Sequence, residues 1–290
     1  MDRLNDILYK AQQHKKRNWL LSKVILENAL QDFPNEKLLY VELGDLYSYR
    51  KMYKKAIQYY TNALKFTEND NDLLFKIATN FLHIDQFALS IEYYDQIKEK
   101  DAETLYNIAN AYSRLHKHEK SIEILYDLIE NYNTTEIPFL LLAEIYYSRR
   151  DYKKSLQTLD DAEKKFGESA AIFYLKASVY AQMEYWIHAV NFYKKADRLN
   201  ARFPNFYRNY AIAVYKLGYS EKAVSFLKRN LKFHNKDSST FFYLIKILLE
   251  LSRFEEADEY IKKVKEKNTM DLNHLAALEM ELMSKYKKKR

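Results

Sequence analysis

Cysteine is absent from this chain of 290 residues, and glycine and proline occur three times each. The absence of cysteine excludes disulfides and any metal site or nucleophile built on a thiol. The glycines, at 44, 167 and 218, are too far apart for a phosphate-binding loop, which needs several within a few residues. Tight strand turns also depend on glycine and proline, so the composition favours helices joined by short connections.

Long hydrophobic runs and a strong charge excess over the body of the chain are lacking as well. The most apolar stretch, FFYLIKILLEL at 241–251, contains Lys246 and is too short to cross a bilayer, and the first residues lack the apolar core of a signal peptide. The net charge is +7, but five charges lie in the basic tail KYKKKR at 285–290, which leaves +2 (7 − 5) for residues 1–284. We therefore expect a cytoplasmic protein without a membrane span, and the charge does not favour nucleic acid as a partner.

A pattern of small and large residues returns about every 34 residues. With Lys37 as position 1, the pattern begins again at 71, 102, 136, 170, 204 and 238, and more weakly at 3. Position 20 is small in all copies, namely Ser22, Ala56, Ser90, Ser121, Ser155, Ala189, Ala223 and Ala257. Position 8 is small in Gly44, Ala78, Ala109, Ala143, Ala177 and Ala211, and is replaced by Lys10 and Ile245 in the first and last copies.

This spacing predicts two antiparallel helices in each repeat. Positions 4, 7, 8 and 11 share one face of a first helix, and positions 20, 24 and 27 share one face of a second. Small residues at 8 and 20 let the two helices approach closely, so Gly44 is interpreted as a packing residue. Position 17 is mostly aromatic and includes Trp19 and Trp186, which we interpret as packing residues at the start of the second helix.

The pattern resembles the tetratricopeptide repeat (TPR). Its signature is matched by Tyr40, Leu43, Gly44, Tyr47, Ala56, Tyr60 and Ala63, although the closing proline survives only as Pro34. The resemblance implies an all-α, right-handed α-solenoid of about eight helix-turn-helix repeats. We expect a single solenoid over 1–290, with repeats at 3–36, 37–70, 71–101, 102–135, 136–169, 170–203, 204–237 and 238–271.

Three segments depart from the regular repeat. The step from 71 to 102 is 31 residues, which predicts a shortened second helix that ends near Lys98. The first repeat has Asp6 and Gln13 at packing positions, as a terminal repeat facing solvent would, and its register can slip by one residue. Segment 272–286 is expected to form a capping helix before the basic tail at 285–290, with one apolar face made of Leu272, Leu275, Leu278 and Leu282.

No motif predicts catalysis or a metal. The segment LHKHEK at 115–120 contains His116 and His118, but His118 occupies packing position 17 and a metal needs convergent ligands. The acidic segment ENDND at 68–72 lacks the glycine and distal glutamate of a calcium loop and is expected to cap a helix. We therefore expect no enzyme activity, no catalytic residues, no cofactor and no metal.

The first helices carry the candidate partner-binding residues. The resemblance implies that these helices line a concave groove, and positions 5, 9 and 13 lie opposite the packed stripe. A mixed surface of aromatic, arginine and amide side chains suits a protein or peptide segment. The candidate groove residues are Phe75, Thr79, Tyr106, Asn107, Asn110, Arg114, Glu144, Tyr174, Ser178, Arg208 and Asn209.

Co-chaperone members of this family clamp a C-terminal carboxylate with a set of lysines, asparagines and an arginine spread over three repeats. No three consecutive repeats carry that set here, although Asn107 and Asn110 are of the right type. The sequence therefore disfavours binding of heat-shock-chaperone tails. The function it favours is a non-catalytic scaffold or adaptor that binds a partner segment in the groove. A nucleic-acid-binding helical repeat protein and a regulatory TPR domain of a larger assembly remain as alternatives.

Overall fold

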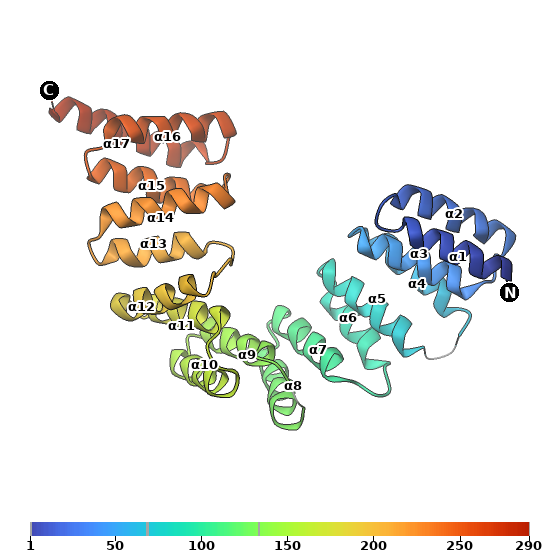
Figure 1. The fold of residues 1–290 in the computed structure, drawn as a ribbon. Helices are drawn as coiled ribbons and strands as arrows, with labels where there is room; N and C mark the ends of the chain where they lie inside the picture. The colour runs from blue at the N-terminus through green and yellow to red at the C-terminus, as the bar shows by residue number, and fades with distance from the viewer. Residues whose placement is uncertain (1, 68–69, 133, 290) are drawn as a thin grey trace. The chain divides into compact units, whose positions relative to one another are not determined.

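The computed structural model describes the backbone of residues 2–67, 70–132 and 134–289, and the side chains within these ranges from Arg3 to Lys285. Along these residues the chain is all α, and its helices follow one another as hairpins (Figure 1). The helices are α1 (Asp2–His14), α2 (Trp19–Asp32), α3 (Lys37–Tyr49), α4 (Tyr53–Leu64), α5 (Asn71–His83), α6 (Phe87–Asp95), α7 (Ala102–Arg114), α8 (His118–Asn131), α9 (Ile137–Ser148), α10 (Tyr152–Phe166), α11 (Ala170–Gln182), α12 (Trp186–Arg198), α13 (Phe206–Lys216), α14 (Ser220–Phe233), α15 (Ser238–Glu250), α16 (Phe254–Lys267) and α17 (Leu272–Lys289).

Packing divides the chain into two compact units, Met1–Ile145 and Tyr146–Arg290. Helices α1 to α8 belong to the first unit and α10 to α17 to the second, while α9 begins in one and ends in the other. Within each unit the helices pack in sequential pairs, as α3 with α4 and α11 with α12. The all-α class, about eight hairpins and a closing helix agree with the repeat pattern.

Close contact between the two helices of a hairpin is confirmed at positions 8 and 20. All eight position-20 residues are buried, as is position 8 in every repeat from Lys37 on. Two serines at position 20 bond directly to the backbone at position 8: Ser90 Oγ donates to the carbonyl of Ala78 at 2.8 Å, and Ser121 Oγ to that of Ala109 at 2.7 Å. A side chain as short as serine reaches across only where the two backbones lie very near each other.

The turn inside most hairpins uses a left-handed residue that is rarely glycine. Position 15 has a positive φ in seven successive repeats, at Lys51, Asp85, His116, Arg150, Glu184, Gly218 and Ser252. Only Gly218 escapes the steric cost that a Cβ atom imposes on this conformation. The low glycine content therefore does not mean that such turns are absent. It means that hairpin packing holds other residues in them.

Helix α6 confirms the predicted short second helix. It has 9 residues and ends at Asp95, three residues before the predicted end near Lys98, whereas the neighbouring second helices α4 and α8 have 12 and 14. The chain turns away early because Ile97 packs into the core beside Tyr94. Asp101 then caps α7 by accepting a hydrogen bond from the backbone N–H of Thr104 at 2.8 Å.

Two further expectations concern helix starts and the first repeat. Asp70 caps α5 by accepting from the Leu73 N–H at 3.1 Å, as expected for the acidic segment, whose Glu68 and Asn69 lie outside the described residues. In α1, Lys10 is exposed and Ala11 is buried. The first helix is therefore shifted by one residue relative to the repeat frame.

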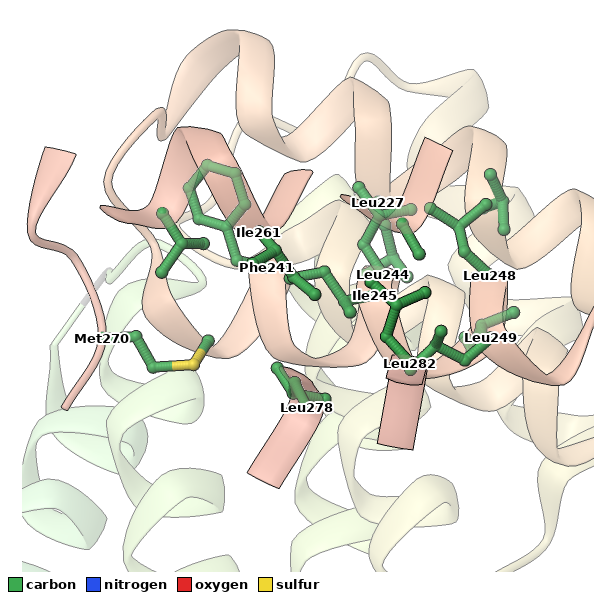
Figure 2. Packing of buried hydrophobic residues seen from close by; sticks show 14 of the residues in the cluster. Leu227, Phe241, Leu244, Ile245, Leu248, Leu249, Ile261, Met270, Leu278 and Leu282 are labelled. Atoms are coloured by element: carbon green, nitrogen blue, oxygen red, sulfur yellow. The ribbon is translucent and has the colours of Figure 1, made fainter. Parts of the chain in front are cut away.

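Helix α17 covers the last hairpin. Leu275, Leu278 and Leu282 are buried against α15 and α16 in the cluster that Figure 2 shows, where Leu282 lies beside Leu249. Leu272, which was expected on the same face, is 78% exposed. The expectation was wrong for this residue because it is the first residue of the helix, before the buried stripe begins.

We expect Gly44→Ala to destabilise the first unit. A Cβ at this position would lie 2.4 Å from the Tyr60 ring, and the Tyr60 hydroxyl is held by Asp45 at 2.6 Å. Overpacking of this kind costs about 1–3 kcal/mol, which outweighs the roughly 1 kcal/mol that alanine gains over glycine in a helix. Urea unfolding followed by circular dichroism measures the difference.

The matched test is Tyr60→Leu. In the repeat from 102 to 135, alanine stands at the position of Gly44 (Ala109) and leucine at the position of Tyr60 (Leu125). Tyr60→Leu should cost less stability in the Gly44→Ala background than in the wild type. Equal costs in both backgrounds would show that residue 44 does not press on the Tyr60 ring.

We expect Leu278→Asp to expose the end of the second unit. The carboxylate would enter the cluster under α17, where burial of an unpaired charge costs about 3 kcal/mol or more. The melting temperature should fall and light scattering should rise as the helix detaches. The control is Met280→Asp in the same helix, since Met280 is 72% exposed. Similar losses for both variants would contradict the proposed capping role of the buried stripe.

Candidate partner-binding face of the first helices

The first helix of each repeat leaves one side partly open. In every repeat from Lys37 on, position 8 is buried, whereas positions 5, 9 and 13 are partly or fully exposed. We call this side, with the neighbouring position 6, the A face. All eleven candidate residues lie on it, and the structure shows which of them are already engaged within the chain.

In the first unit, the Tyr94 hydroxyl gathers three candidates around it. Thr79 Oγ1 lies 2.8 Å from this hydroxyl, the ring of Phe75 meets the Tyr94 ring edge to face at 5.7 Å, and Asn107 lies near enough to lower the pKa of the hydroxyl in part. Burial raises the pKa of Tyr94 to about 12, so the hydroxyl keeps its proton. Phe75, Thr79 and Asn107 therefore join α5, α6 and α7, and only part of each side chain is open.

Helix α7 presents three candidates in the line of positions 5, 9 and 13. Tyr106 and Asn110 are half-buried, and Arg114 is exposed over 61% of its side chain. The Arg114 guanidinium lies 5.4 Å from the centre of the Phe87 ring and 3.7 Å from Asp85. Burial and the negative charge of exposed Glu144 raise the pKa of Tyr106. These side chains leave both an aromatic and a cationic group accessible on one helix.

In the second unit, Tyr174 is part of an aromatic cluster. Its ring stacks on Phe203 at 4.9 Å and packs against Phe206 and Tyr193. Asn209 Nδ2 donates to the Tyr174 hydroxyl at 3.2 Å, and this bond ties α13 to α11. Ser178 Oγ donates to the Tyr174 carbonyl at 2.9 Å. Tyr174, Ser178 and Asn209 therefore contribute to packing within the unit, and only their exposed parts are accessible to a partner.

Among the candidates, Arg208 is bound most strongly within the chain. It donates two hydrogen bonds to the carboxylate of Asp237, at 3.0 and 3.1 Å, and both side chains are largely buried. Asp237 also accepts from the Thr240 hydroxyl at 2.6 Å and from Asn230 Nδ2 at 3.1 Å. A bidentate pair inside such a network fixes the start of α15 on α13 and α14 and leaves little cationic character for a ligand.

A pocket that the sequence did not predict lies between α3 and α5. Its volume is about 350 Å³, and its lining includes Asp45, Tyr60, Lys76 and Asn80 as well as candidates Phe75 and Thr79. The repeat pattern does carry a signal for it, because Asn80 is polar at a position that is apolar in the six other repeats from Lys37 on.

The described residues offer neither a cluster of metal ligands nor a membrane-spanning helix. His116 and His118 lie close, with ring centres 5.7 Å apart, but no group of three or more potential ligands converges within the described parts of the chain. Among the helices of those parts, none combines the length and the apolar character that crossing a bilayer requires.

Comparison with known proteins identifies the repeat. Two models described as tetratricopeptide repeat match residues 39–74 and 102–134. A TPR repeat-containing protein of Methanocaldococcus jannaschii is 23% identical over 251 residues, which are 78% of this chain and 43% of that protein. The chain thus spans less than half the length of this relative.

Solved structures show the same fold. A chain of the APC/C hetero-tetramer Cut9-Hcn1 aligns with a TM-score of 0.63 at 12% identity, over 95% of this chain and 55% of that one. A tetratricopeptide repeat protein from Parabacteroides merdae aligns with a TM-score of 0.62 at 14% identity, over 85% of this chain and 98% of that one. The hairpins with small residues at positions 8 and 20, the two model matches and these relatives agree: the chain is a tetratricopeptide-repeat protein.

Proposed function

We propose that this protein is a non-catalytic scaffold that binds a segment of a partner protein along the A face. The observation that carries the proposal is that α7 has one exposed side and one buried side. Tyr106, Asn110 and Arg114 follow one another at intervals of four residues and therefore line one side of the helix. They remain partly or fully exposed, whereas Ile108 and Ala109 on the other side are buried.

The side chains on this line suit recognition of protein rather than chemistry on a substrate. Tyrosine and arginine are the residues that most often anchor protein interfaces, because they offer a large contact area together with directional hydrogen bonds. Within the described parts of the chain no catalytic set is apparent beside them, since Tyr106 keeps its proton and Arg114 pairs there with the carboxylate of Asp85.

The chemistry of the partner segment follows from the same residues. Tyr106 and Phe75 offer apolar surface, and Arg114 offers a cation whose nearest carboxylate oxygen is 3.7 Å away, longer than a hydrogen bond. A segment with apolar anchors and an acidic group would complement this surface. We propose that it lies along α7 and reaches the neighbouring first helices of the same unit.

We expect the combined change of Tyr106→Ala and Arg114→Ala to weaken partner binding by about 2 kcal/mol or more, as loss of interface anchors does. The measurement is isothermal titration of a partner isolated by affinity purification on the full chain. The far-ultraviolet circular dichroism spectrum should be unchanged, because neither residue belongs to the buried stripe.

The control is Tyr112→Ala on the same helix. Tyr112 packs against the core cluster of α5 and α6, so its loss should lower the melting temperature. If the double variant is folded and binds as tightly as the wild type, the A face of α7 is not the site. If binding is to RNA and falls steeply with salt, the scaffold proposal is wrong.

A further inference from the structure

The pocket between α3 and α5 lies on the A face of the first unit. Its lining comes from α3 and α5, with one residue each from α4 and the turn after α1. These residues are Asp45, Ser48 and Tyr49, then Phe75, Lys76, Thr79 and Asn80, and finally Tyr60 and Lys15. Its volume, about 350 Å³, lies within the range of sites that hold small molecules or single side chains. It is therefore large enough to receive one side chain of a bound segment.

Every charge in the wall of this pocket is balanced within the chain. Asp45 accepts from the Tyr60 hydroxyl at 2.6 Å and lies 3.2 Å from the ammonium of Lys76. Lys76 also pairs with Asp72 at 3.2 Å, and Lys15 lies 3.8 Å from Glu42. An anion entering the pocket would meet Asp45, and a cation would meet the two lysines. The electrostatics therefore favour a neutral polar group.

Asn80 supplies the one unmet hydrogen bond. The residue is 3% exposed, and its Nδ2 donates to the carbonyl of Lys76 at 2.7 Å. Its Oδ1 is shielded from water and accepts no hydrogen bond. Among the described residues with a side-chain atom in this condition, Asn80 alone is fully buried. A buried acceptor without a donor costs about 1–3 kcal/mol, so its presence needs a reason.

The repeat pattern shows that packing does not require asparagine here. Asn80 occupies position 10 of its repeat, and the equivalent residues of the six other repeats from Lys37 on are all apolar and buried. They are Leu46, Ala111, Ile145, Val179, Ala213 and Ile247. An apolar residue would thus serve the hairpin at least as well, which points to a ligand as the missing donor.

We propose that this pocket binds the carboxamide side chain of an asparagine or glutamine in the partner segment. The inference rests on the proposed function and names the chemistry of one contact. The amide NH₂ donates to Asn80 Oδ1, and the amide oxygen accepts from the ammonium of Lys76. A carboxamide is neutral and carries a donor and an acceptor together, as the wall requires.

Entry of the amide requires one lining side chain to move, because Asn80 Oδ1 is shielded in the unbound chain. Tyr49 is the lining residue with the greatest exposure, at 55%, so we propose that its ring is the one that moves. The aliphatic stem of a glutamine would then lie against Phe75 and Tyr49.

The test is selection of peptides from a random 12-residue phage-displayed library on the full wild-type chain. Selected peptides should share a glutamine or asparagine at one position. Changing that glutamine to methionine, which keeps the length and removes the donor, should weaken binding by about tenfold or more. Asn80→Leu should weaken binding of the parent peptide to a similar extent.

A second readout separates recognition from a structural role. Asn80→Leu removes the unmet acceptor and restores the residue type found at Leu46, so its melting temperature should rise while peptide binding falls. The control is Asn191→Leu on α12, at an exposed position, which should leave peptide binding unchanged. A fall in melting temperature with unchanged binding would show that Asn80 is structural and would overturn the inference.

The outcomes also distinguish this inference from the proposed function. If the selected peptides show no preference for an amide, and the combined change of Tyr106→Ala and Arg114→Ala abolishes their binding, the pocket assignment is overturned. The proposed scaffold function is then still supported. Failure to select any peptide on the wild-type chain would count against both.

Discussion

The close approach of the two helices in each hairpin is the constraint on which the rest of the structure depends. Serine hydroxyls at position 20 reach the backbone carbonyls of position 8 at 2.7 and 2.8 Å, which fixes how near the helices lie. Since positions 8 and 20 contribute almost no side-chain volume, large residues on either side supply the apolar area that holds the hairpin together. The opposite side of each first helix takes no part in this contact. Some of its residues bond within the chain, as Arg208 does, and others stay exposed, as Arg114 does.

One glycine shows how packing leads to the pocket. Because Gly44 has no Cβ, the Tyr60 ring can lie against the backbone of α3. A methyl group at this position would be 2.4 Å from the ring, which is too close for both to fit. The ring position places the Tyr60 hydroxyl against Asp45, and Asp45 in turn holds the ammonium of Lys76 from the next repeat. The polar wall between α3 and α5 therefore depends on a residue that lies inside the hairpin and never reaches the pocket.

The sequence predicts the hairpins well because the cause is local and repeated. The small residues, the short α6 and the stripe of α17 could all be placed from spacing alone. Contacts that depend on the connecting segments could not. Tyr174 stacks on Phe203, which lies between α12 and α13 where Asn200 and Asn205 both adopt left-handed backbone conformations. A period of 34 residues contains no information about how such a segment folds back on the preceding first helix.

The repeat pattern also fails to predict polar residues at buried positions. These residues differ in whether the chain provides a partner for their polar groups. Lys176 stands at packing position 7, where burial lowers its pKa, but Asp160 and Glu163 on α10 raise it more, and the ammonium stays charged. Arg208 is matched by both oxygens of Asp237. In each case the chain itself supplies the partner that a buried charge requires. Asn80 receives a partner for its NH₂ group and none for its oxygen. Because the two larger desolvation penalties are offset inside the chain, the smaller one left unmet at Asn80 is the exception, and this residue lines the pocket between α3 and α5.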